Sequence, residues 1–406
     1  MKFITRQISE INADTSLRYY GACLALVNVL TCFYWLIYPV SPIGILARGT
    51  PPICWPFWET CELSRVLSRE ALEIGIILLF LVAVLNAVQF TTQRNATAAY
   101  FVLLGLTVVK CLVVLQDYRL TLNHHYMVLW VSVAYLFIPK KRHVIPSILV
   151  SFYFWAGILK VEPGAGWFNP NSFEGLKPLG VPDSLLVQAR AYVVFLELVV
   201  AFGLLARGQL VFASSLAQIL LFHVLSWSIV GFFYPLLMVL LLAILVLRRM
   251  YQPESREVRE VHPTQARWPI VAATGLFALA QMVPKLIPGD SNLTGEGRMF
   301  ALSMFDAPIE CRLSAVRADG SDVPVPFEKP RLLTSRLRCD PVVYRAAALR
   351  YCKDAGNGPD IRITLESRQQ GQTAYRRVVD IDNFCANPPS YNPLGRNSWI
   401  FAGPSR

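Results

Sequence analysis

Charged residues are scarce in this chain. Asp, Glu, Lys and Arg make up 16% of its 406 residues, whereas a typical soluble domain has about 25%, and 54% of the residues are hydrophobic. The deficit lies between Leu17 and Leu247, whereas the last part of the chain has the composition of a soluble protein. This division predicts an all-α polytopic membrane domain over residues 1–288. A small α+β or β-rich domain is expected over residues 289–406.

The common catalytic and metal-binding motifs are also missing. The sequence has no P-loop, no GxGxxG before a helix, no HExxH and no GxSxG, which excludes the enzyme classes that these motifs define. It has no CxxC spacing either, so we expect no metal site. The net charge of +11 does not indicate nucleic-acid binding, because the basic residues occur in short loops between apolar runs. The N-terminal residues lack the apolar core of a signal peptide.

Long apolar runs are abundant instead, and they predict about nine transmembrane helices. About 20 apolar residues cross a hydrocarbon core, and only helices satisfy the backbone of such a segment internally. The seventh and eighth runs form one block, which we divide at residues 226–235, where Ser, Gly and Pro interrupt it. The predicted spans are 17–39, 71–91, 97–116, 122–138, 144–160, 190–206, 209–228, 231–247 and 269–287.

The basic loop residues predict the orientation of these spans. Lys140, Lys141 and Arg142 follow the fourth span, and further arginines follow the eighth. With nine spans, both groups fall on the side of the N-terminus, which the positive-inside rule assigns to the cytoplasm. The protein is therefore expected in the inner (plasma) membrane, with its C-terminal domain in the periplasm or outside the cell.

Cysteine positions agree with this orientation. Six of the nine cysteines fall on the predicted outer side, where an oxidising compartment favours disulfides, with unpaired thiols as the alternative. Cys54 and Cys61 are close enough in sequence for a local bridge. The other four allow three pairings: Cys311, Cys339, Cys352 and Cys385.

Polar residues at membrane depth are candidates for function. One cluster begins the fourth span, and Lys160 ends the fifth. A tight turn joins these spans, so both should lie near the outer surface, where a desolvated lysine can act as a base. Interfacial histidines and a lysine extended towards water are the alternatives. We call the cluster at the start of the fourth span the outer cluster; it comprises Asn123, His124, His125 and Tyr126.

Four further residues, near Lys160 or deeper in the membrane, are also candidates for the functional site. Trp155 and Trp167 could bound an aromatic ligand near Lys160. Glu197 lies inside the sixth span and His223 inside the seventh, where they could pair with each other or with a substrate. A structural contact between helices is the alternative, and a transporter with a proton relay through these two groups is a weaker one.

Several short motifs resemble those of the vitamin K-dependent gamma-glutamyl carboxylases. Residues 123–127 (NHHYM) resemble the NHxYL motif, and residues 153–161 (YFWAGILKV), followed by Gly166-Trp167, resemble the YFIAGxKKL…W segment. Phe222-His223 with Gly231 is similar to the FH…IG segment, and residues 53–56 (ICWP) are similar to another family stretch. The motifs occur in the family's order over roughly residues 15–250. The wider group is the horizontally transferred transmembrane (HTTM) domain family.

The resemblance implies a reaction. Lys160 matches the base that deprotonates vitamin K hydroquinone or a related quinol, with O2 and CO2 consumed as a peptide or small molecule is carboxylated outside the cytoplasm. We therefore expect Lys160 and His124 to be catalytic. The residues expected to bind the quinol are Asn123, His125, Tyr126, Trp155, Trp167, Glu197 and His223.

Two departures from the family favour a second hypothesis. Leu159 replaces the first lysine of the family's pair, and residues 289–406 replace the large lumenal region of the animal enzymes. The chain could instead be a non-catalytic HTTM protein for peptide maturation, export or immunity, with its C-terminal domain as the partner surface. Residues 361–366 and 375–381 of that domain are predicted to form a hairpin. No oligomeric state is indicated.

Overall fold

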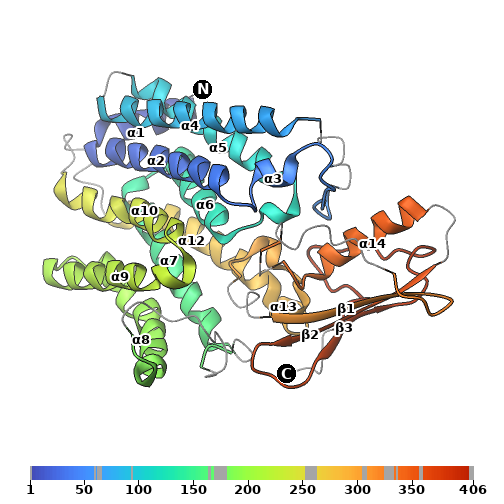
Figure 1. Ribbon diagram of the computed structural model, residues 1–406. Helices are drawn as coiled ribbons and strands as arrows, with labels where there is room; N and C mark the ends of the chain where they lie inside the picture. Colours follow the sequence, from blue (N-terminus) through green and yellow to red (C-terminus); the bar gives the residue numbers. More distant parts are fainter. Residues whose placement is uncertain are drawn as a thin grey trace.

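The computed structural model describes residues 2–58, 61, 66–92, 95–162, 166–168, 181–251, 263–303, 309–323, 333–334, 337–355 and 360–401, with the side chains of 263–266 and 355 excepted. Within these ranges the chain forms a helical bundle, followed by a small sheet with one covering helix (Figure 1).

The bundle contains most of the predicted spans. Eight described helices are long and apolar enough to cross a membrane, and they coincide with eight of the nine predicted spans. Gly231, with φ +74°, ends α9 and separates it from α10, which confirms the division predicted there. The bundle helices are α1 (Lys2–Ala13), α2 (Thr15–Ile37), α3 (Pro42–Leu46), α4 (Arg69–Thr92), α5 (Ala96–Leu115), α6 (Asn123–Phe137), α7 (Lys141–Val161), α8 (Leu186–Leu198, continued as a 3₁₀ segment over Val200–Leu205), α9 (Gln209–Val230), α10 (Phe233–Met250) and α12 (Pro263–Leu286).

Helix α6, at the place of the fourth predicted span, is shorter than the eight helices that are long enough to cross a membrane. Its 15 residues extend about 22 Å, less than the about 30 Å of a hydrocarbon core. It nevertheless connects the two ends of the bundle. Asn123, its first residue, is hydrogen-bonded to Ser303 near the C-terminal domain. Just beyond its last turn, the backbone N–H of Lys141 donates to Glu10 of the N-terminal helix, at 2.8 Å.

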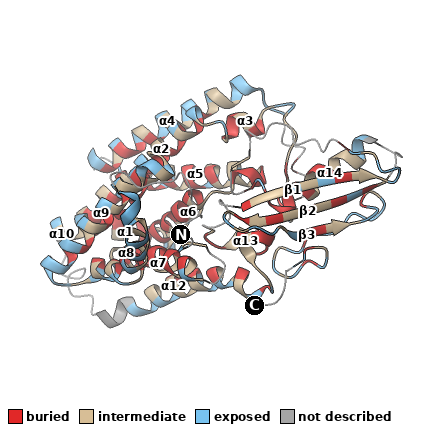
Figure 2. Cartoon of the chain, turned by 60° about the horizontal axis from the view of Figure 1, so that its bottom comes forward, coloured by how far each residue is buried: buried red, intermediate tan, exposed pale blue. Residues whose placement is uncertain are grey.

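Apolar side chains cover the outside of the bundle as well as its core. On α4, the exposed residues recur at helical spacing, which gives one apolar face turned away from the protein (Figure 2). A face of this size on a soluble monomer would be unusual, whereas lipid is its natural solvent. The exposed apolar residues of α4 include Ile74, Ile77, Leu78, Leu81, Leu85 and Val88.

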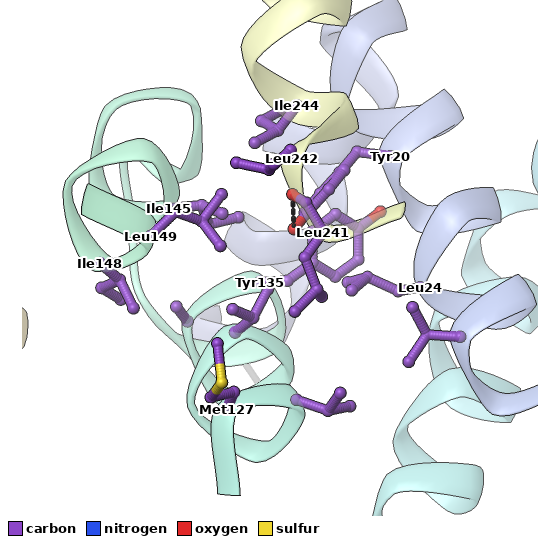
Figure 3. Close-up of a cluster of buried hydrophobic side chains, with 14 of the residues drawn as sticks. Tyr20, Leu24, Met127, Tyr135, Ile145, Ile148, Leu149, Leu241, Leu242 and Ile244 are labelled. Carbon is purple, nitrogen blue, oxygen red and sulfur yellow. Dashed lines mark hydrogen bonds between the residues drawn. The ribbon is translucent and has the colours of Figure 1, made fainter. Parts of the chain in front are cut away.

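Two tyrosines in the core of the bundle donate their hydroxyls to backbone carbonyls of neighbouring helices. Tyr20 donates to the carbonyl of Leu241 at 3.0 Å, among the leucines and isoleucines of α7 and α10 (Figure 3). Tyr135 donates to the carbonyl of Leu17 at 3.0 Å. These bonds fix the contacts of α2 with α10 and α6, because an unpaired buried hydroxyl costs free energy.

Basic residues gather at one end of the bundle, which we call the basic end. Arg142 forms an ion pair with Asp14 at 2.9 Å and donates to the carbonyl of Tyr251 at 3.0 Å. Arg248, at the end of α10, donates to the carbonyl of Leu204 at 2.9 Å. The basic groups that the sequence placed on one side therefore share one end of the structure.

The opposite end, which we call the sheet end, carries the C-terminal domain. This domain is a three-stranded antiparallel sheet in the order β1-β2-β3, packed against α14. The β2–β3 hairpin confirms the predicted one, whereas β1 and α14 were not foreseen. The elements are α13 (Ser291–Thr294), β1 (Ile309–Arg317), α14 (Pro341–Ala355), β2 (Ile361–Gln369) and β3 (Arg376–Ile381).

Three disulfides stabilise the sheet end. Cys54–Cys61 forms as predicted. The structure selects one of the three pairings that the sequence left open, Cys311–Cys339 and Cys352–Cys385. The first of these connects β1 to the turn before α14, and the second connects α14 to the segment after β3. Such bridges stabilise a small domain mainly by restricting its unfolded chain.

We predict a pH-dependent contribution from Glu296, which joins α13 to the end of the chain. Its carboxylate is 1% exposed and accepts hydrogen bonds from Asn397 N and Nδ2 at 2.8 and 2.9 Å. Burial raises the pKa of Glu296 above its ordinary value of 4.5. The folded state thus binds this proton more tightly than the unfolded state, and stability falls as pH rises from 4.5 through the raised pKa.

Glu296→Gln keeps an acceptor for Asn397 and removes the charge. Melting temperatures measured from about pH 4 to about pH 7 should fall less steeply in this variant than in the wild type. Parallel curves for the two proteins would show that the Glu296 carboxyl does not titrate differently on folding.

Candidate functional site

The centre of the candidate site is an ion pair between α7 and α8. Lys160 Nζ lies 2.8 and 2.7 Å from the two carboxylate oxygens of Glu197. The residues are 4% and 2% exposed. Each belongs to the last turn of its helix, so the pair lies near the sheet end of α7. Both charges are neutralised locally, as an apolar environment requires.

A glycine allows the two helices to come this close. Gly157 lies one turn before Lys160 on the same face of α7. A Cβ atom there would lie 2.7 Å from Leu198 Cδ2 and 3.2 Å from Glu197 Cβ, so a larger residue would push α8 away. Gly157 is therefore required for the close packing of α7 and α8 that brings Lys160 and Glu197 together.

Trp167 covers the lysine, as the sequence suggested. Lys160 Nζ lies 5.2 Å from the centroid of the Trp167 ring, within the range of a cation–π interaction. The indole N–H donates to the carbonyl of Arg190 at 3.0 Å, which attaches the ring to α8. Trp155 lies elsewhere, with its ring centroid 5.9 Å from that of Phe154.

Glu197 and His223 each have a separate partner, so the possibility of a pair between them is not realised. His223 is 1% exposed, and its Nε2 lies 2.7 Å from the Tyr153 hydroxyl. Tyr153 lies seven residues before Lys160, on the same face of α7. The ring of Tyr234 follows at 5.9 Å from that of His223, and its hydroxyl lies 4.0 Å from Met127 Sδ. These side chains connect α7, α9, α10 and α6.

The outer cluster lies at the same end of the bundle, but two of its four residues bind the protein's own backbone. Asn123 donates to the carbonyl of Ser303 at 2.6 Å and accepts from its N–H at 3.2 Å. Tyr126 donates to the carbonyl of Phe300 and accepts from Gln281 Nε2 at 3.2 Å. These bonds attach α6 to the segment that leads into the sheet.

The two histidines of the outer cluster face different neighbours. The His124 ring lies 5.5 Å from Tyr34 and 4.8 Å from Phe233, between α2 and α10. The His125 ring lies 5.6 Å from Trp35 of α2. The predicted residues therefore form two groups, one around Lys160 and one around α6, which Tyr153, His223, Tyr234 and Met127 connect.

Sequence reasoning missed a further buried lysine near the sheet end, Lys110 of α5. It is 8% exposed, and its Nζ donates to the Thr31 hydroxyl at 3.1 Å. The sequence contained a signal for this lysine, because Lys110 is the one charged residue in the apolar run of α5. Among the described residues, no three His, Cys, Asp or Glu side chains are grouped as metal ligands.

We predict that the ion pair behaves as one unit in stability measurements. Lys160→Met or Glu197→Leu alone leaves a buried charge without its partner, which costs about 3–5 kcal/mol. The double variant replaces both charges by apolar groups and should recover most of that loss. Thermal unfolding of the purified proteins in detergent measures this. Single variants as stable as the wild type would show that the pair is hydrated or open.

Comparisons of the chain with protein-family models, with curated proteins and with solved structures find no match. The candidate site is therefore defined by its own residues, burial and contacts.

Proposed function

We propose that the protein is a membrane enzyme of the vitamin K-dependent gamma-carboxylase-like group, in the wider HTTM family. It would couple oxidation of a membrane quinol to carboxylation of a peptide or small molecule outside the cytoplasm. The observation that carries the proposal is the burial of Lys160 against Glu197 under the Trp167 ring. The similarity of residues 123–127 and 153–161 to the carboxylase motifs supports it.

The residues present suit a quinol as co-substrate. A quinol is a flat ring with two phenolic hydroxyls, so it needs an aromatic surface and a proton acceptor. Trp167 supplies the surface, and the Lys160–Glu197 pair supplies the acceptor. In the overall reaction, the quinol and O2 give the quinone epoxide and water, while CO2 replaces a hydrogen of the substrate and that hydrogen leaves as a proton.

The ion pair can pass a proton directly between Lys160 and Glu197, without a water molecule. Transfer of one proton from Lys160 Nζ to Glu197 leaves a neutral amine beside a neutral acid, so the pair has no net charge before or after the transfer. The amine can then accept a proton from a hydroxyl held against Trp167.

The proposal includes an orientation. The basic end would face the cytoplasm, according to the positive-inside rule, and the sheet end with its disulfides would face the periplasm or the exterior. Lys160 then lies near the outer surface, where a quinol can arrive from the bilayer and a substrate from solution.

The test uses the Lys160→Met/Glu197→Leu double variant, because it avoids the unpaired charge of the single ones. Proteoliposomes are supplied with vitamin K hydroquinone or menaquinol, a glutamate-containing peptide and labelled bicarbonate. Loss of the base should lower quinol-dependent O2 uptake and label incorporation by about 100-fold or more. The matched control is Arg142→Met/Asp14→Leu, which removes the ion pair at the basic end and should leave both rates close to wild type.

Equal rates in the wild type and the Lys160→Met/Glu197→Leu protein, at equal folded amounts, would contradict a catalytic role for the pair. Equal losses in that variant and in the Arg142→Met/Asp14→Leu control would assign the effect to stability alone.

One observation favours a second candidate function. Asn123 and Tyr126 already bind residues 300–303, and Lys160 already has Glu197, so all three can be explained as structural. On this hypothesis, the chain is a non-catalytic HTTM protein, and its disulfide-bonded domain binds a partner in peptide maturation, export or immunity. Crosslinking in cells separates the two. A partner captured through the C-terminal domain should also be captured by the Lys160→Met/Glu197→Leu protein.

A further inference from the structure

A second group of buried polar atoms lies between α2, α5 and α6, at the sheet end. Helix α5 lies beside α2 and α4, whereas α8, which holds the partner of Lys160, lies on the other side of the bundle (Figure 1). At the centre of this group is Lys110. Within the described residues, its ammonium group has one hydrogen bond, to Thr31, and forms no ion pair. The ammonium group therefore brings a positive charge to a place where none of the described carboxylates neutralises it.

Two more donors adjoin the lysine. Trp35 follows Thr31 by four residues, so both lie on the same face of α2. Its indole is 2% exposed, and Nε1 has no hydrogen-bond partner in the described structure. His125 packs edge-on against this indole, is 5% exposed, and also has both ring nitrogens without a partner there.

This combination is unusual in a folded protein. More than nine in ten buried polar groups have a partner, and each exception calls for an explanation such as an ion or ligand. The ammonium and the indole N–H only donate, and a neutral imidazole has one N–H donor and one acceptor nitrogen. The group that completes Lys110 and Trp35 must therefore accept, and the N–H of His125 can serve as a third donor. The single positive charge selects an acceptor that carries one negative charge.

We propose that Lys110, Trp35 and His125 form a binding site for a carboxylate-type monoanion, separate from the Lys160–Glu197 pair. One carboxylate has two oxygens and room for about four hydrogen bonds, enough for the three donors. Apolar side chains of Cys32, Ile43 and Ile76 pack with Trp35, so the three donors have an apolar surround, in which a small anion or the carboxylate end of a longer molecule would be held by these donors alone. The site is independent of the proposed carboxylation.

The test measures the melting temperature of the full-length protein in detergent with added sodium formate, and with sodium chloride as the control for ionic strength. Formate should raise the wild-type melting temperature in a saturable way, because a ligand that binds the folded state stabilises it. Lys110→Met should fold at least as stably as the anion-free wild type, since it removes an uncompensated buried charge, and should lose the response. Trp35→Phe removes the N–H and should weaken binding about tenfold or more.

Sodium decanoate with a decanol control distinguishes the source of the anion. A shift with formate indicates a free small anion, and a shift with decanoate alone indicates the carboxylate of an amphipathic ligand; both support the site. Equal shifts in the wild type and Lys110→Met, equal effects of decanoate and decanol, or no shift with either anion would overturn it. Because Lys160 is untouched, these results do not depend on the activity assays.

Discussion

Lipid offers no hydrogen bonds, and this constraint shapes the whole bundle. Each polar group that enters the apolar layer must find its partner inside the protein. Tyr20 and Tyr135 satisfy this constraint by donating to backbone carbonyls of neighbouring helices. Lys160 meets it with the carboxylate of Glu197. Polar pairs therefore help to determine the interhelical contacts beside apolar packing. Gly157 is required because one of these pairs needs a short distance between helices.

The same constraint explains why a 15-residue helix can stand where a full span was expected. Nine of the side chains of α6 are buried, so it is surrounded by protein rather than lipid. The segment before it is paired internally: Asp117 accepts three hydrogen bonds from Arg119, and Tyr118 donates to Asp340. A helix enclosed in this way does not need to match the thickness of the membrane.

Much of the fold follows from the sequence, because hydropathy alone locates apolar helices. The eight spans, the break at Gly231, the basic end, the Cys54–Cys61 bridge and the β2–β3 hairpin could each be predicted from local patterns. The remaining features are set by long-range packing. The pairing of Cys311 with Cys339 depends on how β1 lies beside β2, and no local pattern encodes it.

The site shows the same limit. Lys160 and Trp167 could be brought together from their order in the chain, whereas the partner of Lys160 could not. Glu197 was visible as an intramembrane acid, but its choice of Lys160 over His223 depends on how α8 packs against α7. The hydrogen bonds from Asn123 and Tyr126 to residues 300–303 could not be predicted either, because those residues are about 180 positions away in the sequence.

The two buried lysines of the sheet end differ in one decisive respect. Lys160 has its own counter-charge, so it can exchange a proton with Glu197 while the site stays neutral, which is what a base in an apolar pocket needs. Lys110 has no such partner among the described residues, so it is suited to attract a negative charge from outside rather than to pass a proton. The two lysines thus differ in chemistry because they face different helices. Lys160 faces α8, which supplies Glu197, and Lys110 faces α2, which supplies Thr31.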